Sequence, residues 1–129
     1  MSVNSPPDES RALVPVVDAT IVATMHKLDL VNRLYPALIA EIAEKVATLR
    51  VAIEAVDRAT IRHIAHRLRG SSAQLGATAL ARALYAIEEA ACDDSGETLG
   101  SATVGLDDLV RATVAALLIE LERAPSQPP

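Results

Sequence analysis

The chain has 129 residues, half of them hydrophobic, and a formal net charge of −5 at pH 7. This length allows one domain with a core of its own and leaves little room for a second domain. The acidic balance and the lack of a large Lys/Arg cluster argue against nucleic acid as a partner. No apolar run approaches the roughly 18 residues of a membrane-spanning helix, and Met1 to Ser10 do not resemble a secretory signal. We therefore expect a cytoplasmic protein that does not enter a membrane.

Aromatic residues are almost absent from the sequence. Phe and Trp are missing, and Tyr35 and Tyr85 are the two tyrosines. The core must therefore consist of Ala, Leu, Val and Ile, which suits closely packed helices better than a sheet. The single cysteine, Cys92, cannot form an internal disulfide, which agrees with a reducing compartment. We expect it to be a small core side chain.

The two ends of the chain combine proline with small polar residues. Such composition predicts flexible tails at residues 1–13 and 124–129, with one domain over residues 14–123. Within that domain helical spacing recurs, and no strong strand alternation or hairpin signal is present. The sequence therefore predicts an all-α protein.

The first two expected helices come before Asp57. Asp18 should cap a short helix that lies as a lid on the rest of the fold, with His26 as an ordinary lid residue. In the second helix Pro36 should delay the regular part until about Tyr35, because proline breaks or kinks a helix interior. The apolar residues expected to face inward are Ile21, Val22, Met25 and Leu28 in the first helix, and Leu34, Leu38, Ile42, Val46, Leu49, Ile53 and Val56 in the second.

Three further features follow along the chain. Asp57 should cap a third helix from Arg58 to about Gln74, which ends near Gly76. A fourth helix should bury Leu80, Leu84, Ile87 and Ala91 and stop in the loop at residues 93–96. After a less regular stretch over residues 97–105, a last helix should carry Leu106, Leu109, Val110, Val114, Leu117 and Leu121. Long helices with short connections predict an antiparallel four-helix bundle with a short N-terminal lid helix.

The third helix carries the residues of chemical interest. At about 100° per residue, Ile64, Leu68 and Leu75 fall opposite His66, so His66 should point away from the core. An exposed neutral imidazole is a nucleophile near physiological pH. Arg69, one turn further on, can contact phosphoryl oxygens. Gly70 costs about 1 kcal/mol inside a helix relative to alanine. A need for space for a partner's backbone would explain why glycine is found here. The same half-circle also carries Arg62, His63 and Ala73.

Other interpretations of this surface remain open on geometry alone. A histidine among arginines is most often a solvated helix face. His63 and His66 lie one turn apart, but no nearby Cys or acidic residue completes a ligand set, so we expect no metal site. No Ser-His-Asp arrangement and no glycine-rich phosphate loop is recognisable.

The string from His66 to Ala77, HRLRGSSAQLGA, resembles the signature of histidine phosphotransfer (Hpt) domains. In that signature the histidine is followed by an apolar residue, a Lys or Arg, a glycine, two small residues and a Leu-Gly pair. Asp57, Ala65 and the apolar stripe that ends at Glu88 also look like the family, and the likeness extends from about Val16 to Arg123. Arg69 stands where many members have Lys, which keeps the charge but changes the hydrogen-bonding geometry.

The resemblance implies a phosphoprotein intermediate in a multistep two-component phosphorelay. His66 would accept a phosphoryl group from the phospho-aspartate of a receiver domain and pass it to another receiver, with Arg69 stabilising the phosphoryl group. The partners would be a hybrid histidine kinase and response-regulator receiver domains, and the protein would be a monomer without kinase activity. Mg2+ would come from the partner, and the chain itself would need no cofactor. Partner contacts are expected at Arg62, His63, Arg67, Gly70 and Ala73.

Two alternatives belong to other classes. The dimerisation and phosphoacceptor domain of a sensor kinase also presents a histidine on a helical bundle, but its usual motif has proline five residues after the histidine, where this chain has Ser71. A helical adaptor or scaffold without phosphoryl chemistry would need none of these site residues.

Overall fold

The structure is a computed structural model that describes residues 15–93 and 96–125. The expected N-terminal tail (1–13) lies outside the described residues, as does most of the expected C-terminal tail. The described part is α-helical, and its helices are α2 (Ala19–Lys27), α3 (Val31–Glu54), α4 (Arg58–Gln74), α5 (Thr78–Ala90), α6 (Gly96–Ala102) and α7 (Leu106–Arg123).

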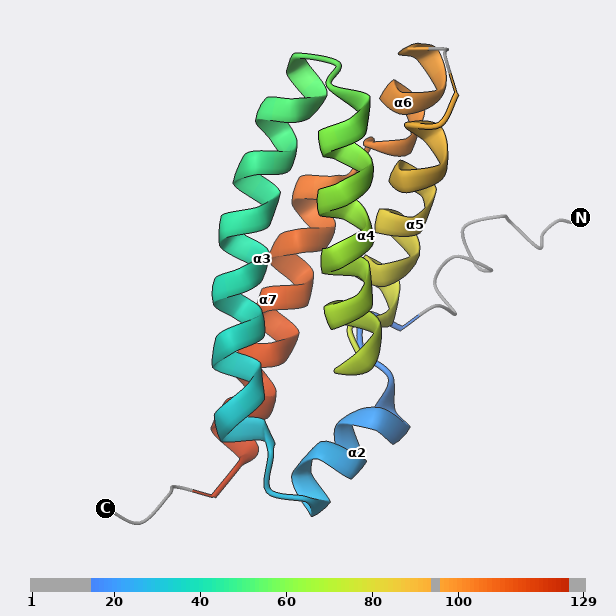
Figure 1. The fold of residues 1–129 in the computed structure, drawn as a ribbon. Helices are drawn as coiled ribbons and strands as arrows, with labels where there is room; N and C mark the ends of the chain where they lie inside the picture. Colours follow the sequence, from blue (N-terminus) through green and yellow to red (C-terminus); the bar gives the residue numbers. More distant parts are fainter. Residues whose placement is uncertain (1–14, 94–95, 126–129) are drawn as a thin grey trace, which may run out of the picture.

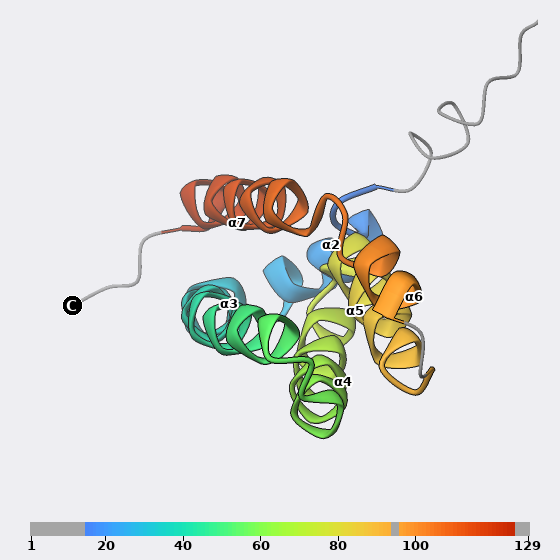
Figure 2. The same ribbon diagram turned by 90° about the horizontal axis from the view of Figure 1, so that it is seen from above.

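Helices α3, α4, α5 and α7 run antiparallel to their neighbours and form a bundle, and α2 lies across one end of it (Figure 1). Seen along the bundle, α4 lies between α3 and α5 on the side away from α7 (Figure 2). The predicted antiparallel bundle with a lid helix is confirmed. Because α4 contacts neighbours on its inner side, its outer face is open to a partner.

The core between these helices is made of aliphatic side chains, as the composition predicts. Leu38, Leu68, Leu84 and Leu117 are at most 1% exposed. Tyr35 is also fully buried, and its hydroxyl donates to the carbonyl of Leu75 at 3.1 Å. Burial, and then the nearby charge of Glu120, raise the pKa of the Tyr35 hydroxyl.

Two aspartates start helices as the sequence predicts. The Asp18 carboxylate accepts from the backbone N–H groups of Thr20 and Ile21, at 2.9 and 3.0 Å. The Asp57 carboxylate accepts from the backbone N–H of Thr60 at 3.3 Å and from its hydroxyl at 2.7 Å. These bonds satisfy donors that the first turn of a helix leaves without partners. They fix where α2 and α4 begin.

Helix α3 begins earlier than the sequence indicates. The prediction of a regular helix only from about Tyr35 is wrong, because α3 starts at Val31 and runs through Pro36. Pro36 is exposed, so its ring does not disturb the core. Val31 and Tyr35, in the first turns, are 2% and 0% exposed. Their burial outweighs the backbone hydrogen bond that proline removes, a loss of about 3 kcal/mol.

Three residues predicted to be buried are exposed. Leu28 is 58% exposed because it follows the last turn of α2, and Cys92 is exposed beyond the end of α5. Val56 is 53% exposed and has φ +52°, since it lies in the turn after α3 and not in the helix. Periodicity places these side chains inward only if the helices continue through them.

The irregular stretch over residues 97–105 contains a helix that the sequence did not predict. Helix α6 packs against α5, and Leu99 within it is 2% exposed. The pattern is hard to see because a seven-residue helix with two glycines has low intrinsic helix propensity. Burial of Leu99 supplies the stabilisation instead.

The lid is attached to the bundle at two places. The Gly76 carbonyl accepts from the Asp18 N–H at 2.8 Å, and a Cβ at Gly76 would lie 3.1 Å from Ile21 Cγ2. Gly76 also has φ +91°, which favours glycine. At the other attachment His26, expected to be an ordinary lid residue, pairs through Nε2 with Glu120 Oε1 of α7 at 2.9 Å. Gly76 therefore fixes the lid beside the end of α4, and His26 fixes it to α7.

Candidate phosphoacceptor site

His66 lies near the middle of α4 and points outward, as predicted. Its side chain is 63% exposed, whereas Ile64 and Leu68 on the opposite side are buried. The helix wheel therefore places His66 correctly. The five predicted partner-binding residues are all exposed on the same helix: Arg62, His63, Arg67, Gly70 and Ala73.

Glu88 of α5 contacts the imidazole of His66. The distance from His66 Nδ1 to Glu88 Oε2 is 2.9 Å, and the Glu88 side chain is only 20% exposed. A carboxylate only accepts, so this contact is a hydrogen bond in the tautomer that carries its proton on Nδ1. In a neutral imidazole the lone pair available for attack is then on Nε2. Glu88 thus favours the tautomer in which the outer nitrogen, Nε2, has the free lone pair.

Arg69 completes a three-residue cluster with His66 and Glu88. Its Nε–H donates to Glu88 Oε1 at 3.0 Å, and its Nη2 lies 3.0 Å from His66 Nδ1. A guanidinium can only donate, so with a proton on Nδ1 this second approach is a contact and not a hydrogen bond. Glu88 therefore binds both groups, one with each carboxylate oxygen, and holds the guanidinium beside the imidazole.

Gly70 leaves open space one turn after His66. A Cβ built on Gly70 meets no atom within 4 Å. The glycine is therefore not required by packing inside this chain, although it weakens the helix by about 1 kcal/mol relative to alanine. Its absent side chain leaves the backbone of α4 accessible next to His66.

A hollow of about 440 Å3 lies beside the cluster, where α2, α4 and α5 meet. It is partly apolar and partly charged, and its lining includes Asp18, Ile21, Arg69, Ala73, Thr78, Ala81, Arg82 and Tyr85. Because Arg69 lines this hollow, a protein that covers it would bring its own groups close to His66.

The sequence profile of the Hpt domain matches residues 33–124. The chain belongs to the Hpt domain family. The structure of histidine-containing phosphotransfer protein B from Pseudomonas aeruginosa superposes with a TM-score of 0.77 at 21% identity, over 87% of this chain and 99% of that chain. At this identity the likeness shows the fold alone. No curated protein sequence matches the chain.

The predicted site residues of this Hpt domain do not all meet. The structure brings Arg69 to His66, but among the described residues no hydrogen bond or ion pair joins Arg62, His63 or Arg67 to His66. Arg62, His63 and Arg67 surround the site as exposed charged or ionisable groups and give it a basic surface.

Glu88 and Tyr85 were not among the predicted site residues. The sequence pattern marks Glu88 only as the end of an apolar stripe, and Tyr85 only as one of two aromatic residues. Both lie on α5, which the sequence places next to α4, but their register against His66 depends on how the two helices pack. A search for charged residues on the face of α5 that meets α4 would have found Glu88.

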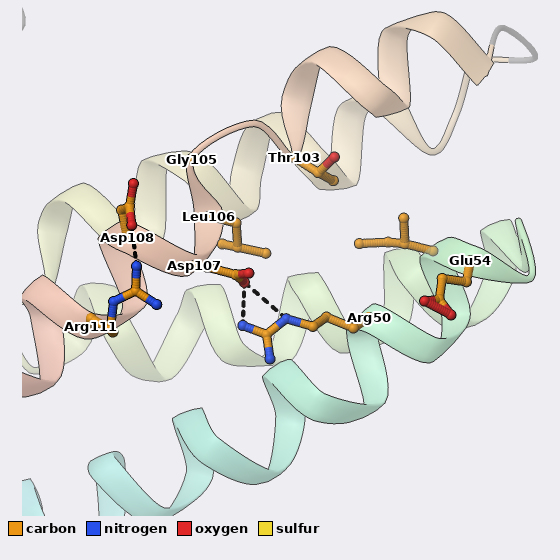
Figure 3. A pocket seen from close by; sticks show the side chains of 9 residues that line it. Arg50, Glu54, Thr103, Gly105, Leu106, Asp107, Asp108 and Arg111 are labelled. Carbon is orange, nitrogen blue, oxygen red and sulfur yellow. Dashed lines mark hydrogen bonds and ion pairs between the residues drawn. The ribbon is translucent and has the colours of Figure 1, made fainter.

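A second hollow of this Hpt domain, of about 490 Å3, lies between α3 and the start of α7 (Figure 3). Its arginines are engaged by acidic neighbours: Arg50 pairs with Asp107, and Arg111 pairs with Asp108. None of its lining residues belongs to the His66 cluster.

In the described part of the chain, no group of three or more His, Cys, Asp or Glu is placed to hold a metal ion. Among the helices described there, none is long and apolar enough to cross a membrane.

Proposed function

We propose that this Hpt domain is a phosphorelay intermediate that takes a phosphoryl group onto Nε2 of His66 from a receiver-domain phospho-aspartate and gives it to the aspartate of a second receiver. The observation that carries the proposal is the contact of Glu88 with Nδ1, which leaves the exposed Nε2 as the nucleophilic atom. The donor would be the receiver of a hybrid histidine kinase, and the acceptor the receiver of a response regulator. We place this exchange in the cytoplasm and assign it to a monomer.

The transfer step requires no proton from solvent. The Nε2 lone pair attacks phosphorus, a nitrogen–phosphorus bond forms, and the bond from phosphorus to the aspartyl oxygen breaks. The electron pair of that bond leaves on the aspartate as a carboxylate. The imidazole becomes cationic while Nδ1 keeps its proton, and the Glu88 carboxylate beside it stabilises this charge. In the second transfer the new aspartate attacks, and the electron pair returns to Nε2.

Arg69 is the residue best placed to stabilise the phosphoryl oxygens. Glu88 binds its Nε, and the terminal nitrogen Nη2 of the guanidinium lies 3.0 Å from Nδ1 of His66. Donors that are held in place before the reaction stabilise developing charge without reorganisation. Mg2+ would be supplied by the receiver, since the chemistry of transfer is mainly positioning and electrostatics.

The basic surface of α4 favours encounter with an acidic receiver pocket. Arg62, His63 and Arg67 are exposed around His66, in a chain whose net charge is −5. A local positive region in an acidic protein steers a complementary partner and disfavours wrong orientations. Gly70 and Ala73 would meet the partner's backbone, because their small size leaves space for it on the surface of α4.

Transfer from a labelled receiver tests the proposal. A receiver domain carrying 32P-labelled phospho-aspartate is mixed with the chain, and the expected result is acid-labile, base-stable label on the chain. Labelled ATP alone should give no label. Labelling by ATP without another protein would instead favour the sensor-kinase domain. Retention of all label on every receiver tried would favour the adaptor and overturn the proposal.

A further inference from the structure

The guanidinium of Arg69 lies over the ring of Tyr85 on α5, with its central carbon 5.3 Å from the ring centroid. Glu88 binds the same guanidinium at Nε. Arg69 is thus held by an aromatic face and by a carboxylate, both from α5. We infer that Tyr85 is a positioning residue for phosphoryl transfer, which acts by holding Arg69 beside His66. This inference rests on the proposed function of His66.

The ring of Tyr85, and not its hydroxyl, makes the contact. Among the residues that the structure describes, no hydrogen bond joins the Tyr85 hydroxyl to another group, and Tyr85 is 51% exposed. An aromatic face attracts a cation through its electron-rich centre, and arginine also stacks on it with its planar group. Phenylalanine should therefore replace tyrosine here without loss, whereas leucine, although similar in bulk, should not.

Holding Arg69 matters because a free arginine side chain has many rotamers. The Arg69 side chain is 32% exposed, and Glu88 and Tyr85 contact its guanidinium from α5. Its rotamer entropy must be lost before a terminal nitrogen can meet the phosphoryl oxygens. With Tyr85 and Glu88 in place, most of that loss occurs when the protein folds. The benefit should appear in the transfer rate more than in partner affinity.

A docking role is the competing explanation, because Tyr85 also lines the hollow beside the site. The two roles predict different behaviour with a small donor and in the absence of Arg69. Phosphoramidate transfers a phosphoryl group to an imidazole through a phosphorus–nitrogen bond, with ammonia as leaving group and no protein surface to dock. A residue that acts through Arg69 should affect both donors, whereas a docking residue should affect only the receiver.

The experiment compares Tyr85→Leu and Tyr85→Phe, each in the wild-type and Arg69→Ala backgrounds, with phosphoramidate and with a phosphorylated receiver. We expect Tyr85→Leu to slow labelling of His66 by about two- to fivefold with both donors, the change that a loss of about 0.5–1 kcal/mol of cation–π stabilisation gives. Tyr85→Phe should label at the wild-type rate. In the Arg69→Ala background Tyr85→Leu should have no further effect, because the group that it positions is absent.

Three results in the labelling assay would overturn the inference: an unchanged rate in Tyr85→Leu, a loss with the receiver only, or a loss that persists without Arg69. Thermal melts check that each variant is folded. The Nε–H resonance of Arg69 provides a readout that needs no donor, since it should shift in Tyr85→Leu and not in Tyr85→Phe. Failure of the wild-type protein to take phosphate from either donor would contradict the proposed function instead, while an unmoved resonance would contradict only the role of Tyr85.

Discussion

At the scale of single residues, Glu88 connects the two groups that the phosphoryl group would meet. One carboxylate oxygen binds His66 Nδ1 and the other binds Arg69 Nε. Glu88 therefore binds both the proposed nucleophile and the proposed charge-stabilising group. The roles that we propose for Arg69 and Gly70 are separate, although the two residues are neighbours on α4, because Gly70 contributes no side chain to the cluster.

Substitutions at Arg69 and Gly70 should separate chemistry from docking. Arg69→Ala removes a charged donor, and since hydrogen bonds to charged groups contribute about 1.5–3 kcal/mol, transfer should slow by about tenfold or more with little change in receiver affinity. Gly70→Gln should keep the bundle folded and raise its melting temperature slightly, because helix propensity improves and the site is open. It should nevertheless slow transfer by obstructing the receiver.

Melting curves, receiver-binding titrations and transfer rates on both variants give the comparison. Normal transfer by Gly70→Gln, or a loss caused by unfolding, would remove the argument that the glycine is kept open for a partner. An Arg69→Ala variant that binds the receiver weakly but transfers at the normal rate once bound would place Arg69 in docking instead.

The sequence predicted part of this cluster and missed the rest for a physical reason. His66 and Arg69 lie on one helix, and their relation follows from the helical repeat alone. Glu88 and Tyr85 come from α5, and their distance from His66 depends on the packing register of two helices and on side-chain rotamers. Cys92 was predicted to be buried because of its residue type. It is exposed, because it lies beyond the end of the helix that would have turned it inward.

At the scale of elements, the ends of the helices decide where the site lies. Asp57 fixes the start of α4, and Gly76 allows the chain to turn into α5. Both were predictable because capping and positive φ have strong residue preferences. The start of α3 at Val31 and the existence of α6 were not predictable. The burial of Val31, Tyr35 and Leu99 outweighs the low helix propensity of the proline and glycines in these segments.

The turn between α3 and α4 holds Val56 in a left-handed conformation, with φ +52°. A β-branched residue is disfavoured there by about 1–2 kcal/mol, and Val56 is too exposed to lose much burial. Val56→Gly should therefore raise stability by about 0.5–1 kcal/mol and the melting temperature by about 2–4 °C. Ala55→Gly is the matched control: Ala55 has φ −81°, so glycine there should lower the melting temperature. Equal effects of the two substitutions would contradict the strain.

The cap at Asp57 should make stability depend on pH. Hydrogen bonds from the Thr60 hydroxyl and then from its backbone N–H lower the pKa of the Asp57 carboxyl. A carboxyl with a lower pKa in the folded state contributes stability above its unfolded value, about pH 4, and loses it as the pH falls through the folded value. Asp57→Asn keeps a capping oxygen without the charge. Its deficit in melting temperature should be constant near pH 7 and shrink below about pH 4, and a deficit independent of pH would show that the charge is not the source.

At the scale of the whole molecule, an aliphatic sequence with almost no aromatic residues folds as a bundle in which one helix leaves its outer face open. Four segments with an amphipathic helical pattern, joined by short connections, were enough to predict that bundle. Helices of this kind bury their apolar stripes against one another. The lid's hydrogen bond between His26 and Glu120 was not predictable, since it joins residues 94 positions apart. The lid contributes Asp18 and Ile21 to the hollow beside Arg69, so the fold brings the start of the described chain to the site.

The central claim is that His66 is the phosphoacceptor, and a comparison of the three histidines tests it most directly. His66→Gln, His63→Gln and His26→Gln are each incubated with a receiver carrying labelled phospho-aspartate, and acid-labile label on the chain is measured. Only His66 combines exposure with a Glu88 contact at Nδ1. We predict that His66→Gln takes up no label, whereas His63→Gln and His26→Gln still accept the phosphoryl group. Label on His66→Gln at the wild-type level would contradict the account.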